Sequence, residues 1–349
     1  MKKTINKIVL ISIGIIIASV SFAQDQEEAI ASMKIPWDSY VEWWYFNGAL
    51  LLQDDVQQVS FPFILILGHE SRVMTAGNPP RQLLMTILID YHDEPGMISD
   101  SHTNMNPGDG INKYLNPDLK NFYYSLPEER IIVQREKEDF IINVKNKSEV
   151  ALYLRVKLLH PVEAQSCAGL LKLDEQLPLL AYDYPVVEYS GEVTLKGKKF
   201  NVAKGSGYID YNAWRVQWTK TVKEWFWFSA LTDDYQATFF GIRTAEHDFI
   251  EYDIRSLTLL DRKNSAIKEY CGDQINVHVK ENKSEDSAVI TLTTNDVSLI
   301  LEAERDWSYL LNRPEYINDM HFTEIKMTYD NKNYFGFAFI EFLDSIMAQ

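Results

Sequence analysis

Hydrophobic and polar residues alternate with a period of two along most of this chain, whereas long runs with the 3.6-residue period of a helix are scarce. Short polar turns, such as those at 53–55 and 330–332, separate the alternating segments. This arrangement is typical of antiparallel sheets closed into barrels or sandwiches. The pattern predicts strands at 42–51, 59–67, 82–90, 138–144, 150–159, 187–195, 198–210, 224–231, 236–243, 252–260, 286–293, 296–303, 321–329 and 333–343.

Three segments depart from this alternation. The stretch 307–318, with Asp306 as a candidate N-cap, and the stretch 164–176 predict short helices. Segment 92–130 is long, polar and rich in Gly, Pro and Asn. Long connections of this kind are often functional, so we expect an excursion between strands that can cover the mouth of a cavity.

The N-terminus has the features of an export signal. Lysines precede an apolar stretch at 8–17, and the Ser-Phe-Ala tripeptide at 21–23 provides small residues at the −3 and −1 positions of a cleavage site. The alternative is a membrane anchor, but the apolar stretch is shorter than the roughly 20 residues that a span requires. We therefore predict a signal peptide at 1–23, cleaved before Gln24. The remaining chain is expected in the periplasm or outside the cell, without stable membrane insertion.

The rest of the chain is long enough for two domains with cores of their own. Each half contains a Trp-rich strand that leads into a hairpin, at 42–51 and at 224–231. This similarity indicates two related barrels. We place the N-terminal domain at 24–219 and the C-terminal domain at 220–349.

Charge and motif content exclude several classes of function. The formal net charge is −16, and so acidic a surface repels phosphate backbones and anionic lipids, which argues against a nucleic-acid partner. The histidines show no His-x-x-x-His or His-x-His spacing, so we predict no metal site. The acidic stretch around His92 and His102 is interpreted as a solvated loop. No nucleophile elbow or phosphate-binding fingerprint occurs, so we predict no cofactor.

Cys167 and Cys271 are the only cysteines of the chain. An oxidising compartment permits a bridge between them, but one pair does not make a disulfide framework. Two buried free thiols are therefore the expected state of these residues.

Two aromatic strands are candidates for the walls of a binding site. In the Glu-Trp-Trp-Tyr-Phe-Asn-Gly string at 42–48, Trp43, Tyr45 and Asn47 share one face. Asn47 can contact a ligand there, or it can simply satisfy backbone groups near a strand end. Trp225 and Trp227 share a face in the second half. We expect the two Trp-bearing faces, one from each half, to meet across a cleft.

Asp210 is the candidate acid. It shares a strand face with Tyr208 and Asn212, and a carboxyl group in aromatic surroundings can stay protonated and donate its proton. The alternative is a structural Asp that caps a turn or pairs with Arg215.

These residues carry a family resemblance. The string at 42–48 resembles the signature of the two-domain lipocalin-like proteins related to carotenoid 1,2-hydratase, a family that includes fungal Diels–Alderases. The Gly-Tyr-x-Asp-x-Asn at 207–212 and the Trp-x-Trp at 225–227 are similar to further segments of that family, as are Glu324 and the strand at 336–341. The resemblance implies two lipocalin-like domains, an apolar cavity and acid-catalysed addition of water to an isoprenoid double bond. It also implies that Asp210 is the proton donor and that aromatic faces stabilise a cation.

We therefore expect an all-β protein of two lipocalin-like antiparallel barrels or sandwiches, acting as an exported enzyme on a hydrophobic unsaturated isoprenoid or polyene. Hydration or cyclisation would occur in an aromatic-lined cavity, with a pericyclase as a close variant. The alternative from another class is a periplasmic carrier of an apolar lipid or isoprenoid without turnover. Asp210, Asn212 and Tyr208 are the expected catalytic group. The expected substrate contacts are Trp43, Tyr45, Asn47, Trp225, Trp227 and Glu324.

Overall fold

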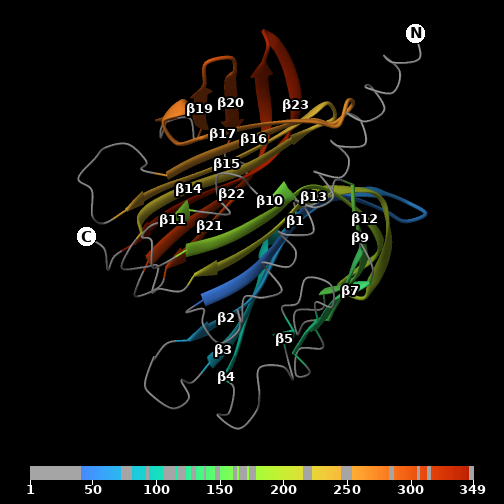
Figure 1. Cartoon of the computed structure of the whole chain (residues 1–349). Helices are drawn as coiled ribbons and strands as arrows, with labels where there is room; N and C mark the ends of the chain where they lie inside the picture. Colours follow the sequence, from blue (N-terminus) through green and yellow to red (C-terminus); the bar gives the residue numbers. More distant parts are fainter. Residues whose placement is uncertain are drawn as a thin grey trace, which may run out of the picture.

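A computed structural model shows two antiparallel β-sheets that follow one another along the chain (Figure 1). It describes residues 41–71, 81–91, 94–104, 115–116, 123–126, 131–136, 139–145, 150–159, 163–164, 171–172, 178–214, 222–244, 254–282, 287–304, 307–312 and 316–345. The predicted signal peptide and the predicted domain boundary at 219/220 both lie outside these residues. The all-β prediction is confirmed, since the only helical turn among the described residues is a 3-10 turn at Gly272–Gln274.

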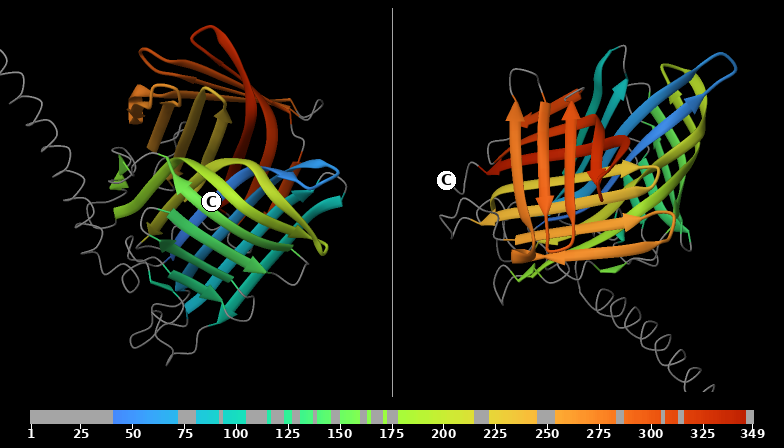
Figure 2. Two further views of the ribbon diagram at one scale, coloured as in Figure 1. Left: turned by 90° about the vertical axis from the view of Figure 1, so that its right-hand side faces the viewer. Right: turned by 90° about the horizontal axis from the view of Figure 1, so that it is seen from above.

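The first sheet has 13 strands within the described residues and curls strongly (Figure 2, blue to yellow-green). The strands are β1 (Val41–Gln53), β2 (Gln58–Ser71), β3 (Arg81–Tyr91), β4 (Glu94–Asn104), β5 (Leu115–Asn116), β6 (Tyr123–Leu126), β7 (Ile131–Glu136), β8 (Asp139–Lys145), β9 (Val150–Leu158), β10 (Glu163–Ala164), β11 (Leu171–Lys172), β12 (Pro178–Leu195) and β13 (Lys198–Trp214). Their order is β4-β3-β2-β1-β13-β12-β9-β8-β7-β6-β5, and the short β10 and β11 pair with β12.

The second sheet has 10 strands in the described part of the chain. They are β14 (Val222–Thr232), β15 (Tyr235–Thr244), β16 (Ile254–Asp261), β17 (Ala266–Cys271), β18 (Asn276–Asn282), β19 (Ser287–Thr293), β20 (Ser298–Glu304), β21 (Trp307–Asn312), β22 (Tyr316–Tyr329) and β23 (Lys332–Ser345). Their order is β17-β16-β15-β14-β23-β22-β20-β19-β18, and β21 pairs with β22.

The two sheets share one topology. In each, the first strand lies between the second strand and the last strand, so β1 is flanked by β2 and β13, and β14 by β15 and β23. The hairpin between the last two strands also turns alike in both halves. Its two central residues have positive φ, 49° and 78° at Lys196 and Gly197, and 51° and 57° at Asp330 and Asn331. Such turns match the twist of paired strands, and Gly, Asn and Asp adopt them readily.

Each sheet encloses a hydrophobic core of its own. Trp44, Phe46 and Tyr211 belong to the first core, and Phe226 and Phe228 to the second. These residues occupy alternate positions on their strands, as the two-residue period requires. A third buried cluster draws its members from both sheets: Tyr45, Ile64, Tyr208, Trp227, Met320, Phe322 and Phe339. The outward faces of β1 and β13 therefore pack against those of β14, β22 and β23.

The two predicted helices are wrong where the structure describes them. Residues 307–312 form β21, which pairs with residues 317–322 of β22. Pairing at a sheet edge satisfies the backbone of this segment, and tertiary context of this kind overrides local propensity. In 164–176, the described residues belong to the short strands β10 and β11. The predicted excursion at 92–130 is likewise interrupted by β4 at 94–104. None of the described residues forms a helix long and apolar enough to cross a membrane.

The expectation of free thiols is wrong. Cys271, at the end of β17, is disulfide-bonded. The one other cysteine of the sequence is Cys167, which lies outside the described residues.

Candidate functional site

The two Trp-bearing faces meet between the sheets. The ring centroids of Trp43 and Trp225 are 6.0 Å apart, and those of Tyr45 and Trp227 are 5.2 Å apart in an edge-to-face arrangement. Tyr208 completes the contact, with its ring 5.4 Å from that of Trp227. Offset and edge-to-face rings at these separations attract one another in addition to the area they bury. Sequence alternation predicted that these rings share one face of each strand, and the packing of the two sheets brings the faces together.

Asp210 lies inside this aromatic contact. It is opposite Tyr45 in the register of β1 with β13, and its side chain is only 7% exposed. The Asn212 amide donates a hydrogen bond to Asp210 Oδ1, with 2.8 Å between the nitrogen and the oxygen. The predicted group of Asp210, Asn212 and Tyr208 therefore shares one strand face, with Asn212 positioned to orient the carboxyl. The alternative partner, Arg215, lies outside the described residues.

Glu341 is a second buried carboxyl group that the sequence analysis did not select. It lies on β23 opposite Trp227, and it accepts a hydrogen bond from the Asn318 amide of β22. Burial raises the pKa of Glu341 to about 7, against the opposing effect of hydrogen bonds from Asn318 and Trp225. The sequence feature that could have identified Glu341 is its position two residues after Phe339 and four after Phe337, which makes it an acidic residue on an aromatic strand face.

Tyr45 is the aromatic residue that both carboxyl groups influence. Burial raises its pKa well above the usual value, and the negative charge of Glu341 and, more weakly, that of Asp210 raise it further. The Asn47 side chain acts in the opposite direction. The Tyr45 hydroxyl therefore keeps its proton at neutral pH.

Two glycines, one in the segment 42–48 and one in the segment 207–212, leave space for the Tyr189 ring. Gly48 and Gly207 face one another across β1 and β13, and a Cβ on Gly207 would lie 2.7 Å from the Tyr189 ring and 2.0 Å from the Asn47 carbonyl oxygen. The Tyr189 hydroxyl in turn donates a hydrogen bond of 2.8 Å to that carbonyl. The backbone of Asn47 is thus fixed by packing that only glycine permits, while its side chain stays buried beside Tyr45.

Glu324 lies apart from the other candidate residues. Its side chain is exposed, and its strand position is opposite Phe337, two residues beyond Phe322 on β22. The predicted contact of Glu324 with a substrate stays a prediction.

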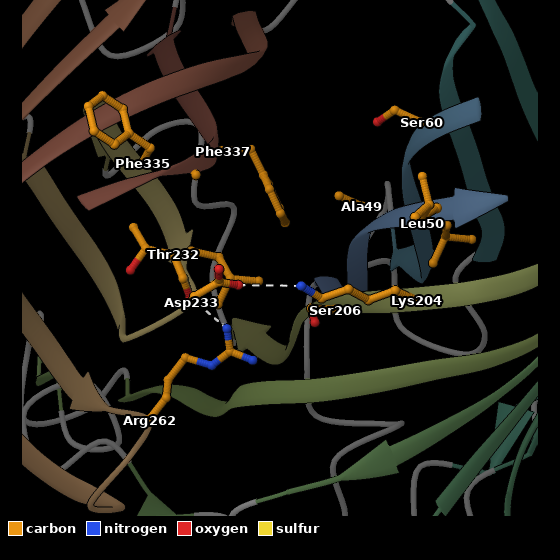
Figure 3. A pocket seen from close by; sticks show the side chains of 13 residues that line it. Ala49, Leu50, Ser60, Lys204, Ser206, Thr232, Asp233, Arg262, Phe335 and Phe337 are labelled. Carbon is orange, nitrogen blue, oxygen red and sulfur yellow. Dashed lines mark hydrogen bonds and ion pairs between the residues drawn. The ribbon is translucent and has the colours of Figure 1, made fainter. Parts of the chain in front are cut away.

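A cavity of about 260 Å³ lies between the sheets at the other end of this interface (Figure 3). Lys204 Nζ and Asp233 Oδ1 approach to 3.3 Å across it, and Arg262 donates a hydrogen bond of 2.6 Å to the Thr232 carbonyl. Its wall residue Ser206 is four positions from Asp210 on β13, or roughly 13 Å along a strand. The lining residues are Ala49, Leu50, Leu51, Ser60, Lys204, Ser206, Leu231, Thr232, Asp233, Arg262, Phe335, Gly336 and Phe337.

None of the residues predicted to bind substrate lines this cavity. The cavity nevertheless lies between the same two strand faces as these residues. Ala49 follows Tyr45 and Asn47 on one face of β1, and Leu231 follows Trp227 on one face of β14. The first strands of the two halves therefore run side by side in the same direction, with aromatic rings at one end and the cavity at the other. Within the described part of the chain, no three His, Cys, Asp or Glu side chains gather in a way that would hold a metal ion.

Solved structures share this fold. A protein assigned as AttH from Nitrosomonas europaea matches with a TM-score of 0.63 at 14% identity, over 89% of this chain and 95% of that one. Kievitone hydratase from Nectria haematococca matches with a TM-score of 0.59 at 12% identity, over 88% and 89% of the two chains. CghA, solved with Sch210972, matches with a TM-score of 0.62 at 10% identity over the same shares.

The likeness to two-domain lipocalin-like proteins is thus confirmed at the level of the fold. No protein-family model and no curated protein matches the sequence.

Proposed function

We propose that this protein is an exported enzyme that protonates a hydrophobic unsaturated small molecule of the isoprenoid or polyene class. The observation that carries the proposal is the position of Asp210, a buried carboxyl group that Asn212 orients between the aromatic rings of two sheets. Burial favours the protonated form of a carboxyl group, and only that form has a proton to give. One of the proteins that share the fold is a hydratase.

The reaction needs a proton donor and a surface that tolerates positive charge. Asp210 gives its proton to one carbon of the double bond, whose π electrons form the new C–H bond and leave a cation on the other carbon. The faces of Trp43, Trp225 and Trp227 attract that cation through the negative face of the aromatic ring. A water oxygen or a second double bond then supplies the electrons that end the reaction, which gives hydration or cyclisation.

The second candidate is a carrier that binds an apolar lipid without turnover. The cavity lined by Ala49 and Phe337 favours this candidate, because Asp210 is not among the residues that line it. A carrier needs that cavity alone, whereas an enzyme needs Asp210 beside its substrate.

The replacement Asp210→Asn separates the two candidates. The variant keeps the shape and hydrogen bonding of the side chain but has no acidic proton. An enzyme should keep its fold and its affinity for the probe geranylgeraniol while turnover falls by about 10²-fold or more, the usual scale for loss of a general acid. Asp139→Asn, which alters an aspartate paired with Arg155 away from both the cavity and the aromatic site, is the matched control and should keep full turnover.

Product formation from geranylgeraniol and lycopene, followed by mass spectrometry, is the measurement. Binding with no product from the wild type would favour the carrier, and unfolding of Asp210→Asn would make the residue a structural one. Export is tested separately, because N-terminal sequencing of the mature protein should begin at Gln24.

A further inference from the structure

The two halves of the molecule correspond residue by residue around the candidate site. Trp43 and Tyr45 of β1 occupy the places that Trp225 and Trp227 occupy in β14, each on the outward face of the first strand of its sheet. The string Trp-Trp-Tyr-Phe-Asn-Gly at 43–48 corresponds to Trp-Phe-Trp-Phe-Ser-Ala at 225–230. The repeat is therefore visible in topology, in strand face and in residue type.

The pairing with the last strand follows the same correspondence. Tyr45 is opposite Asp210, and its counterpart Trp227 is opposite Glu341. Five residues farther along each first strand, Leu50 is opposite Gly205 and Thr232 is opposite Gly336. Because these registers agree, Asp210 and Glu341 occupy equivalent positions in the two halves.

The carboxyl groups of Asp210 and Glu341 also lie in the same contact between the two sheets. Both strands present these side chains on the outward face that packs against the other sheet, beside the buried cluster of Tyr45, Tyr208 and Trp227. Tyr45 experiences the charge of both groups. The Asn318 amide donates a hydrogen bond to Glu341, as the Asn212 amide does to Asp210.

We propose that Glu341 is the proton acceptor of the site in which Asp210 is the donor, so that each half of the molecule supplies one of the two acid–base groups. This inference rests on the proposed function and narrows it to addition of water. Cycloaddition transfers no proton and would use neither carboxyl group, whereas hydration requires both a donor and an acceptor.

The protons and electrons balance over one cycle. Asp210 protonates one alkene carbon, and the π electrons form the C–H bond. The oxygen of a water molecule then forms a bond to the cationic carbon, and one of its protons passes to the Glu341 carboxylate. The product is an alcohol, Asp210 is left ionised and Glu341 is left protonated. Return of one proton from Glu341 to Asp210 through water restores the starting state.

Few other ionisable groups face Glu341. Among the described residues, those on the strand faces turned toward it are Tyr45, Tyr208 and Asp210 from the first sheet. From the described part of the second sheet, only Glu324 of β22 shares this face near it, four residues beyond Met320 and exposed to solvent. Other ionisable residues close to Glu341 on β22 and β23 lie on the strand faces that point away from it: Asp319 and His321 of β22, and Asp344 of β23. A pH dependence that disappears with Glu341 is therefore assigned to Glu341 itself.

The test uses octyltrimethylammonium as a mimic of the cation and octan-1-ol as a neutral control, with calorimetric titration at pH 5.5 and pH 8. An ionised Glu341 attracts the cation, so the wild type should bind octyltrimethylammonium about tenfold more tightly at pH 8. Glu341→Gln should bind it equally at both pH values. Glu302→Gln, an exposed glutamate paired with Lys326 on β20 and β22, should behave as the wild type does. Octan-1-ol should bind independently of pH.

A second variant keeps the test informative if Glu341→Gln does not fold. Asn318→Ala removes the donor that stabilises the ionised form of Glu341, so the midpoint of the pH dependence should move to higher pH. If Glu341→Gln retains the pH dependence of the wild type, or if Asn318→Ala leaves the midpoint unchanged, the role of Glu341 is overturned. The role of Asp210 then still stands on turnover by Asp210→Asn. If the wild type does not bind the cation at either pH, the role of Glu341 is likewise overturned, and turnover by the wild type and Asp210→Asn decides the proposed function separately.

Discussion

The two halves of this protein have the same strand order and the same outward aromatic face, yet they hold their buried carboxyl groups differently. Asp210 is oriented by Asn212, two residues along its own strand, whereas Glu341 accepts its hydrogen bond from Asn318 on the neighbouring strand. The shorter Asp210 lies opposite a tyrosine, and the longer Glu341 lies opposite a tryptophan. A repeated scaffold thus offers two equivalent positions, and the local partners can give each carboxyl group a separate task.

The two ends of the interface differ as well. One end is filled by rings that exclude water around Asp210 and Glu341, while the other end opens into the cavity beside Lys204 and Arg262. Burial shifts the pKa of a carboxyl group only where water is excluded. Under the proposed function, proton transfer would take place at the aromatic end and a ligand would enter at the open end.

The largest effect on stability is expected from truncating one aromatic residue in the core of the first half and one in the interface between the halves. Trp44→Ala removes a ring packed in the core of the first half, 5.0 Å from Tyr211, and Trp227→Ala removes a ring from the interface between the halves. Each should lower the free energy of unfolding by about 3–5 kcal/mol, as large aromatic truncations in cores do. Chemical denaturation followed by circular dichroism measures both.

Ligand binding should distinguish these two variants. Geranylgeraniol should quench the tryptophan fluorescence of the wild type and of Trp44→Ala, and Trp227→Ala should lose most of that response. Equal quenching in both variants would show that the aromatic interface between the halves is only a structural core. The interface would then not differ in function from the core of the first half.

The second effect concerns Glu341 and depends on pH. The carboxyl group ionises near pH 4.5 in the unfolded chain but only near pH 7 in the folded protein. Between these values the folded state binds more protons, so the stability of the wild type falls as pH rises toward 7. Glu341→Gln cannot titrate. Its stability relative to the wild type should therefore be about 3 kcal/mol greater at pH 8 than at pH 4.

Urea denaturation at several pH values measures this difference, with Glu302→Gln as the matched exposed control. A constant difference between Glu341→Gln and the wild type from pH 4 to pH 8 would mean that Glu341 titrates normally. It would also end the argument that the aromatic layer keeps water away from this carboxyl group.

The smallest effect is expected at the open end of the interface. Lys204 and Asp233 form an ion pair of 3.3 Å, and their side chains are 70% and 90% exposed. Exposed pairs of this kind contribute about 0–1 kcal/mol. Lys204→Ala should therefore change the midpoint of thermal unfolding very little, and high salt should abolish the remaining difference. A loss of stability comparable to that of Trp227→Ala would show that the two ends of the interface are energetically alike.

Much of the candidate site was visible in the sequence. The alternation around Trp43 and Tyr45, and again around Trp225 and Trp227, assigned these rings to one face of each strand, and the structure has them there. The same reasoning placed Asp210 beside Asn212. Glu341 was missed because its importance depends on pairing with Trp227 and on hydrogen bonding to Asn318, which come from distant parts of the chain.

The sequence by itself determined the all-β architecture, the sharing of one strand face by the aromatic side chains and the similarity of the two halves, because strand periodicity is a local property of the chain. Tertiary structure alone decided that residues 307–312 pair as a strand, that Cys271 is bridged, and that the rings of the two halves pack in direct contact. It also decided that Asp210 and Glu341 are both buried at the contact between the two sheets. These features arise from contacts between residues far apart in the chain, and local patterns of hydrophobicity do not specify which surfaces will pack together.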